Sequence, residues 1–140
     1  MRGSSLVRLA AVAALLIESA ACASAPPPVC TAPAASVAVT ELYFGRNIPG
    51  GNEVSEPEWH RFLDETVTSR FPEGFTVLDG EGQYRMADGS IVRERSKVLV
   101  LIGVKGNVDA RLDEVIADYK RRFRQESVLR RGGVACVSFR

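Results

Sequence analysis

The sequence has few of the residues that usually hold metals or carry out nucleophilic catalysis. Among 140 residues it has one histidine, His60, and three cysteines, none of them in a C-x-x-C pair. Zinc sites need closely spaced Cys and His ligands, so we expect no metal. The sequence contains no G-x-S-x-G motif and no Cys–His pair in a recognisable catalytic context. We therefore expect no catalytic triad, no metal and no other cofactor.

The sequence also lacks an apolar run long enough to span a membrane. Its longest uninterrupted run covers the nine residues 9–17, whereas a membrane-spanning helix needs about 20. Arg2 and Arg8 precede this run, and small residues surround Cys22 behind it. This arrangement is typical of a secretory signal peptide. We predict that residues 1–21 are a signal peptide and that the protein is exported.

Two cleavage sites are compatible with this leader. The segment 19–22, Ser-Ala-Ala-Cys, resembles the lipobox of bacterial lipoproteins, in which the cysteine is lipidated. Small residues at A-x-A spacing, at 21–23 and 23–25, also suit ordinary signal peptidase. The protein is then either tethered to a membrane by a lipid on Cys22 or released into the periplasm or medium.

Neither sign of charge dominates the exported part. Without the leader, which contains Arg2, Arg8 and Glu18, the chain has 16 basic and 16 acidic residues. Non-specific nucleic-acid binding depends on a basic surface, so we expect no nucleic-acid partner. The balance also argues against electrostatic adhesion to membranes, which leaves the possible lipid on Cys22 as the only predicted membrane contact.

The pattern of residues predicts one small domain behind a linker. Residues 22–36 are rich in Pro and Ala and form the linker or tether, and residues 37–140 form the domain. We predict strands at 37–46, 75–86, 91–104 and 127–139. One helix begins after Ser55 and ends before Phe71, and a second is capped by Asn107. The β-α-β-β-α-β order predicts an α+β ferredoxin-like fold, with antiparallel sheet order 4-1-3-2 and both helices on one face.

This topology brings the two remaining cysteines together. The end of the fourth strand lies beside the start of the first, so Cys136 comes within reach of Cys30. An exported protein meets an oxidising compartment, which favours a Cys30–Cys136 disulfide. The alternative is two free thiols.

Five segments occur in an order that resembles a known family. They are ELYFGR at 41–46, RFPEG at 70–74, VLDG at 77–80, ERSKVL at 94–99 and QESVLR at 125–130. Together they resemble the bacterial domain of unknown function 3574 over residues 38–139, although Ser69 and Tyr84 replace an expected Pro and Trp. The resemblance implies a small exported bacterial protein, often with a lipoprotein-like leader. It implies no catalytic residue, because the family has no established activity.

The predicted hairpin offers a first candidate site. A two-residue turn at Asp88-Gly89 places Gln83 opposite Glu94 on one face of the hairpin. The other face then carries Arg95 and Lys97 above two glycines, which leaves room for a carboxylate or phosphate. The alternative is ordinary cross-strand charge pairing on a solvated hairpin.

The topology gives a second candidate site. The start of the last strand lies beside the end of the first, so Gln125 and Glu126 should come near Tyr43 and Arg46. An Arg–Glu pair beside a tyrosine can bind a small polar ligand or transfer a proton. The alternative is a structural tie between a loop and a strand.

Two functions remain open. The first is a binding or interaction module, tethered to the cell envelope, that uses the helix-free sheet face for an envelope protein, a small ligand or a second copy of itself. The second is a small enzyme with an acid/base site beside that face. The candidate ligand-binding residues are Tyr43, Arg46, Gln83, Glu94, Arg95, Lys97, Gln125 and Glu126.

Overall fold

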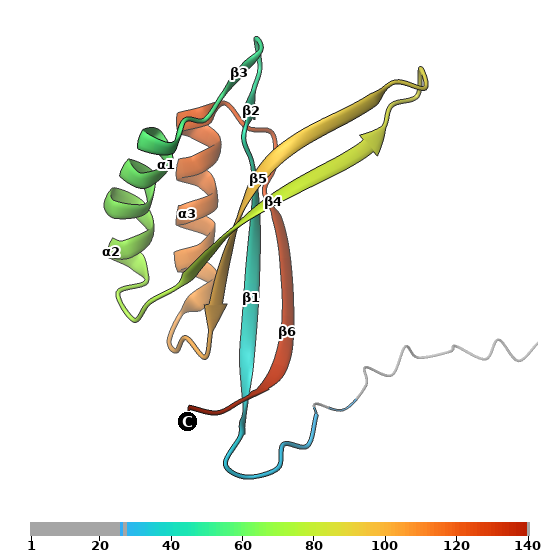
Figure 1. The fold of residues 1–140 in the computed structure, drawn as a ribbon. Coiled ribbons are helices and arrows are strands. Elements are labelled where there is room, and N and C mark those ends of the chain that lie inside the picture. The colour runs from blue at the N-terminus through green and yellow to red at the C-terminus, as the bar shows by residue number, and fades with distance from the viewer. Residues whose placement is uncertain (1–25, 27, 140) are drawn as a thin grey trace, which may run out of the picture.

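A computed structural model of the chain describes residue 26 and residues 28–139 (Figure 1). The predicted signal peptide and Cys22 lie outside these residues. Within the described part of the chain, no helix has both the length and the apolar character needed to cross a membrane.

Four long strands form one antiparallel sheet. They are β1 (Ala35–Gly45), β4 (Thr76–Arg85), β5 (Ile91–Ile102) and β6 (Leu129–Val137). The sheet order is β4-β5-β1-β6, so β1 is hydrogen-bonded on both sides. Helical segments cover one face of this sheet, and the other face has none (Figure 1). The predicted α+β class, with a four-stranded antiparallel sheet and two helices, is confirmed.

The first helix comprises three consecutive segments, α1 (Glu56–Phe62), the π-helical turn η1 (Leu63–Val67) and α2 (Thr68–Arg70). Ser55 caps it in the predicted way. Its hydroxyl accepts the Glu58 N–H, and the Glu58 carboxylate accepts the Ser55 N–H at 2.9 Å. Asn107 caps the second helix, α3 (Val108–Phe123), as predicted.

The segment after β1 contains more structure than expected. The predicted elements leave residues 47–54 without a strand, whereas β2 (Asn47–Ile48) and β3 (Asn52–Glu53) form a short antiparallel hairpin. Gly50 and Gly51 both have positive φ angles, 106° and 91°, which allow the tight reversal between the two strands. This hairpin lies at the same end of the sheet as the tip of β4 and β5 (Figure 1).

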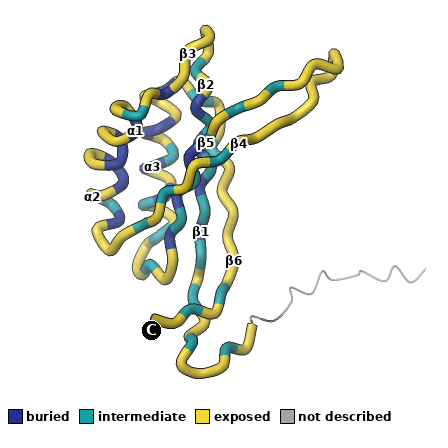
Figure 2. Tube along the Cα trace, in the orientation of Figure 1, coloured by how far each residue is buried: buried dark blue, intermediate teal, exposed yellow. Residues whose placement is uncertain are grey.

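The core lies between the helices and the sheet (Figure 2). Leu42 and Phe44 of β1 are fully buried there, as the alternation of apolar residues predicted. The Phe44 ring meets the Tyr119 ring at 4.6 Å and the Trp59 ring at 5.4 Å between centroids. Such tilted aromatic pairs add to the free energy gained from burying their area.

The hairpin between β4 and β5 has a different register from the predicted one. Gly82 lies opposite Glu94, and Gln83 lies opposite Arg93. The loop has three residues, 87–89, because Met86 still bonds Ser90 across the hairpin at 2.8 Å. A shift of one residue changes which side chains share a face. The predicted basic strip above the glycines is therefore wrong, because Glu94 is the residue that shares their face.

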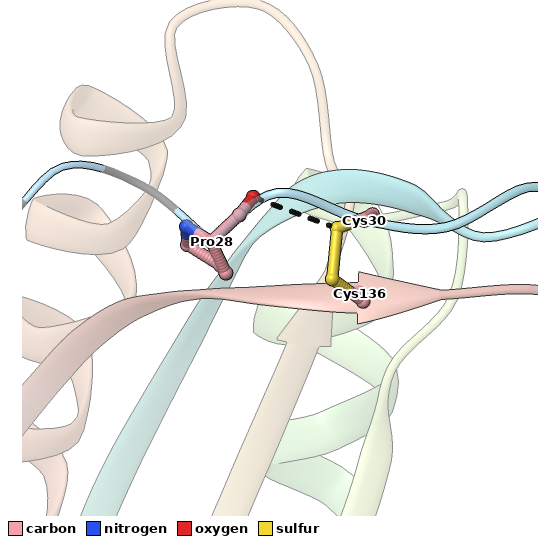
Figure 3. Close-up of a disulfide and its surroundings, with 3 residues drawn as sticks. All are labelled: Pro28, Cys30 and Cys136. Carbon is pink, nitrogen blue, oxygen red and sulfur yellow. Dashed lines mark hydrogen bonds between the residues drawn. A yellow bond between two sulfur atoms is a disulfide. The ribbon is translucent and has the colours of Figure 1, made fainter.

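The predicted disulfide between Cys30 and Cys136 is confirmed, with a Cα–Cα distance of 5.5 Å (Figure 3). Cys136 lies opposite Ser36 near the start of β1. The bridge therefore fixes the segment before β1 to the end of β6.

Two predicted ligand-binding cations instead form ion pairs on the helix side of the sheet. Arg46 and Lys97 are 3% and 5% exposed, so neither can face a ligand. Arg46 binds the Glu56 carboxylate at 2.7 Å and donates to the Val54 carbonyl at 2.8 Å. Lys97 binds Glu56 at 2.9 Å and Asp79 at 2.6 Å. The network joins β1, β4 and β5 to the start of α1.

This network should make stability depend on pH. Hydrogen bonds from Lys97 lower the pKa of Glu56 and of Asp79 from their ordinary values. A carboxyl with a lowered folded-state pKa stabilises the fold above its unfolded pKa, and that contribution disappears as pH falls through the folded value. The free energy of unfolding should therefore fall below about pH 4.5. Urea unfolding at several pH values measures it.

Lys97→Met should flatten this acid dependence, since it removes the cation that holds both carboxyls ionised. The exposed Lys105, which forms no salt bridge within the described residues, provides the control variant Lys105→Met. An acid dependence equally steep in Lys97→Met and in the unmodified protein would contradict this role.

Candidate functional site

A cavity of about 540 Å³ opens on the helix-free face where β1 ends. Its walls come from β1, the β2–β3 hairpin, the β4–β5 hairpin and the chain between α3 and β6. The residues used below are Tyr43, Gly45, Asn47, Gly82, Tyr84, Glu94, Arg124, Gln125, Glu126 and Leu129. We call this the open-face cavity.

Glu94 is the central charged group of the open-face cavity. Its side chain projects from β5 over Gly45, and a Cβ added to Gly45 would lie 2.5 Å from Glu94 Oε1. The Asn47 N–H donates to the same oxygen at 3.3 Å. Among the described residues, Glu94 is the only partly buried carboxylate without a salt bridge. It can therefore accept hydrogen bonds from a ligand.

Two tyrosines line the open-face cavity together with Glu94. Tyr43 is partly buried, and its hydroxyl donates to Glu41 Oε2 at 2.6 Å. This hydrogen bond is the main reason that the pKa of Tyr43 is raised. Tyr84, on the same face of β4, is 53% exposed and offers a free aromatic surface. Both rings can pack against a flat apolar group.

The chain between α3 and β6 closes the opposite side of the open-face cavity. Arg124 ends α3 in the left-handed conformation, φ 51°, and donates to the Pro49 carbonyl at 2.9 Å. The Gln125 amide donates to the Asn47 carbonyl at 2.7 Å. These two bonds fix the segment against the β2–β3 hairpin. Glu126, the next residue, is exposed and forms no salt bridge within the described residues.

A second cavity, of about 500 Å³, lies between the β2–β3 and β4–β5 hairpins. Gln83, Arg93 and Arg95 line it together with Glu53. Arg95 is 3.5 Å from the Glu53 carboxylate, which also binds Arg46 at 3.1 Å. Because cations and carboxylates are mixed in this cavity, it has no excess of one charge.

The structure thus separates the predicted site residues into three places. It brings Tyr43, Glu94, Gln125 and Glu126 together in the open-face cavity. Gln83 and Arg95 lie in the second cavity, which Glu94 also lines. Arg46 and Lys97 belong to the ion-pair network. Arg46 therefore does not pair with Glu126 beside Tyr43, because its guanidinium points to the helix side.

Gly45 and Tyr84 were not among the predicted site residues. Gly45 is essential to the shape of the open-face cavity, since it leaves the space that the Glu94 carboxylate occupies. Only the correct hairpin register places Tyr84 with Glu94. Within residue 26 and residues 28–139, no three His, Cys, Asp or Glu side chains are grouped as metal ligands.

The sequence model of one family, described as Protein of unknown function (DUF3574), matches residues 39–139. The chain belongs to the DUF3574 family. This match confirms the resemblance found in the sequence, and it covers every residue of the open-face cavity named above. A search of curated proteins found no match to this DUF3574 protein.

Two solved structures share the fold of this DUF3574 protein. One is a phage SAM lyase in complex with S-methyl-5'-thioadenosine, with a TM-score of 0.52 and 15% identity, covering 74% of this chain and 90% of that one. The other is a phage SAM lyase in the apo state, also with a TM-score of 0.52 and 15% identity, with coverage of 73% and 89%. At this identity the likeness shows the fold alone.

Gly45→Ala should displace the Glu94 carboxylate. The new methyl group would lie 2.5 Å from Oε1 and 2.9 Å from Cδ, so the side chain must move. The Asn47 amide would lose its acceptor, and its chemical shift in an NMR spectrum should change. Gly82→Ala is the matched control, because its Cβ would meet the Glu94 carbonyl oxygen at an ordinary 3.8 Å. Equal shifts of Asn47 in both variants would contradict the role of Gly45.

Proposed function

We propose that this protein is an exported module that binds a small ligand in the open-face cavity. The observation that carries this proposal is Glu94, a partly buried carboxylate with no salt-bridge partner among the described residues, which lines the cavity together with two tyrosines. The Asn47 N–H occupies only one of the positions at which this carboxylate can accept a hydrogen bond. A ligand that donates to Glu94 would occupy the others.

The surrounding groups favour a ligand with a flat ring and hydroxyl groups, as in a nucleoside. A carboxylate recognises the hydroxyls of ribose well, and aromatic side chains pack on a base. Tyr43, Tyr84 and Glu94 offer these two kinds of contact within one cavity. The phage SAM lyase that shares the fold is described in complex with S-methyl-5'-thioadenosine, a nucleoside. We therefore use this compound as the probe.

We further propose that the domain has the ferredoxin-like topology. The two short strands, β2 and β3, form a sheet of their own. When they are set aside, the four long strands in chain order are β1, β4, β5 and β6. The observed neighbours then correspond to the order 4-1-3-2.

Glu94→Gln should weaken binding of S-methyl-5'-thioadenosine about tenfold or more, since a hydrogen bond to a charged group is worth about 1.5–3 kcal/mol. Isothermal titration calorimetry measures the affinity. Asp113→Asn is the matched control, because Asp113 is exposed on α3, away from the cavity. The control should bind as the unmodified protein does.

Two results would contradict this proposal. Absence of binding by the unmodified protein would exclude the nucleoside class that the probe represents. Equal affinity of Glu94→Gln and the unmodified protein would exclude Glu94 as the acceptor.

An enzyme with an acid/base carboxylate is the second candidate, and the same feature favours it. Glu94 lies in a partly enclosed cavity and has no salt-bridge partner among the described residues, so its carboxylate is available to take a proton from a substrate. Arg46 and Gln83, which we expected in such a site, lie elsewhere. Incubation with SAM, with S-methyl-5'-thioadenosine as the product followed, distinguishes the two candidates. Turnover that Glu94→Gln abolishes would favour the enzyme.

The placement of the open-face cavity supports a tethered module. The Cys30–Cys136 bridge fixes the incoming chain at the start of β1. The cavity is lined by Tyr43 and Gly45, at the other end of this strand. Eleven strand residues span about 35 Å. A lipid on Cys22 would therefore leave the cavity directed away from the membrane.

Intact mass of the protein from its host's envelope tests this tether. We expect a chain that begins at Cys22 and carries the added mass of a lipid anchor. A chain without added mass that begins after residue 23 or 25 would contradict the lipid anchor and indicate a released domain. Reduction should add two protons for the disulfide, which serves as an internal control.

A further inference from the structure

Away from the open-face cavity, the helix-free face has a regular pattern along β1 and β6. Four pairs of neighbours point away from the helices, because the residues between them on β1 include the buried Leu42 and Phe44. The pairs are Val37 with Ala135, Val39 with Gly133, Glu41 with Arg131, and Tyr43 with Leu129. We call these eight residues the β1–β6 strip.

Near the start of β1, the side chains of the strip are large on β1 and small on β6. At two neighbouring levels β1 carries valine, whereas β6 carries alanine or glycine. A Cβ placed on Gly133 would have no other atom within 4 Å. A shallow hollow of about 180 Å³ lies here, lined in part by Val39, Gly133 and Ala135.

This pattern is complementary to itself. A twofold axis along the boundary between β1 and β6 would place β1 of one copy over β6 of the other. Val39 of each copy then faces the hollow above Gly133 of its partner copy. Stacked sheets pack about 10 Å apart, with the strand directions of the two sheets within about 30° of each other. This spacing allows a side chain of one copy to reach the hollow of the other. A twofold interface makes each contact twice.

The same twofold axis would also bring oppositely charged residues of the two copies together. Arg131 donates to both oxygens of Glu41 at 3.0 Å within one chain. The Arg131 side chain is still 70% exposed, so it retains donors that no described residue covers, whereas Glu41 is 19% exposed. The same axis places Arg131 of each copy over Glu41 of the other. A four-charge cluster of alternating sign would then lie between the copies.

We propose that the β1–β6 strip is the interface of a homodimer. These observations favour a second copy as the partner. Each chain carries both halves of each contact on neighbouring strands: Val39 on β1 and the hollow at Gly133 on β6, and Glu41 on β1 and Arg131 on β6. An unrelated protein would require no such relation.

The dimer does not depend on the ligand. The strip meets the open-face cavity only at Tyr43 and Leu129. Failure of S-methyl-5'-thioadenosine to bind would leave the mass of the assembly unaffected, so the two proposals are tested separately.

Paired charge reversals test the interface. Glu41→Arg and Arg131→Glu each place like charges opposite one another in a homodimer, and each breaks the pair within the chain. Each variant alone should therefore dissociate at least about tenfold more readily than the unmodified protein. A mixture of the two restores opposite charges only between chains, so it should form a heterodimer. Native mass spectrometry of the disulfide-bonded protein identifies each species.

Three results would overturn the proposal: an unmodified protein that is monomeric, single variants that dimerise as it does, or a mixture that forms no heterodimer. Each variant's far-ultraviolet circular dichroism verifies that it is folded. A steric pair provides a second test, since Gly133→Leu fills the hollow and Gly132→Leu places the same group on the opposite face of β6. The first should give monomers and the second dimers, and the reverse would contradict the assigned face.

Discussion

β1 is hydrogen-bonded on both sides, to β5 and to β6, and its alternation determines what each face of the domain carries. Leu42 and Phe44 fill the core under the helices, and Phe44 contacts the rings of α1 and α3. The residues between and beside them, Glu41, Tyr43 and Gly45, belong to the open face. Because the period of a strand is two, a shift of one residue would exchange the two sets and destroy core and site together.

The end of β1 links the core to the site. Gly45 leaves the space into which the Glu94 carboxylate fits, and its carbonyl accepts the Tyr119 hydroxyl at 2.9 Å from the helix side. Arg46 turns its guanidinium to the helix side and ties α1 to the sheet. Asn47 then contacts both Glu94 and Gln125. Three consecutive residues thus fix the floor and one wall of the open-face cavity.

Periodicity in the sequence was enough to predict the four long strands and the two helical regions, although not the short β2–β3 hairpin. The alternation in β1 and the Ser55 capping box are local patterns, and both predictions are confirmed. The Cys30–Cys136 pairing followed from the expected neighbouring of the first and last strands, and it is confirmed as well. The hairpin register was not predictable in the same way. The Asp88-Gly89 pair suits a two-residue turn, but the loop includes Ala87, with the Asp88 carboxylate accepting the Ser90 N–H at 2.9 Å. The added residue moved Gln83 away from the face of Glu94 and placed Glu94, in place of Arg95, opposite Gly82.

The side of the sheet on which each charged residue lies has a similar physical cause. Arg46 and Lys97 alternate into the helix side, where three carboxylates lie close enough to neutralise them. Sequence spacing showed that these residues are near other polar groups. It did not show the face that Arg46 takes just after β1, and the wrong hairpin register placed Lys97 above the glycines. Glu94 has no cation because the register places it above glycines instead of opposite an arginine.

The central claim is that the open-face cavity is where this protein holds its ligand. Titration of the ¹⁵N-labelled protein with S-methyl-5'-thioadenosine, followed by amide chemical shifts, tests it most directly. We predict that the largest changes occur at Gly45, Asn47 and Gln125, around the Glu94 carboxylate. Changes confined to the second cavity, at Arg93 and Arg95, or no changes at all, would contradict the claim.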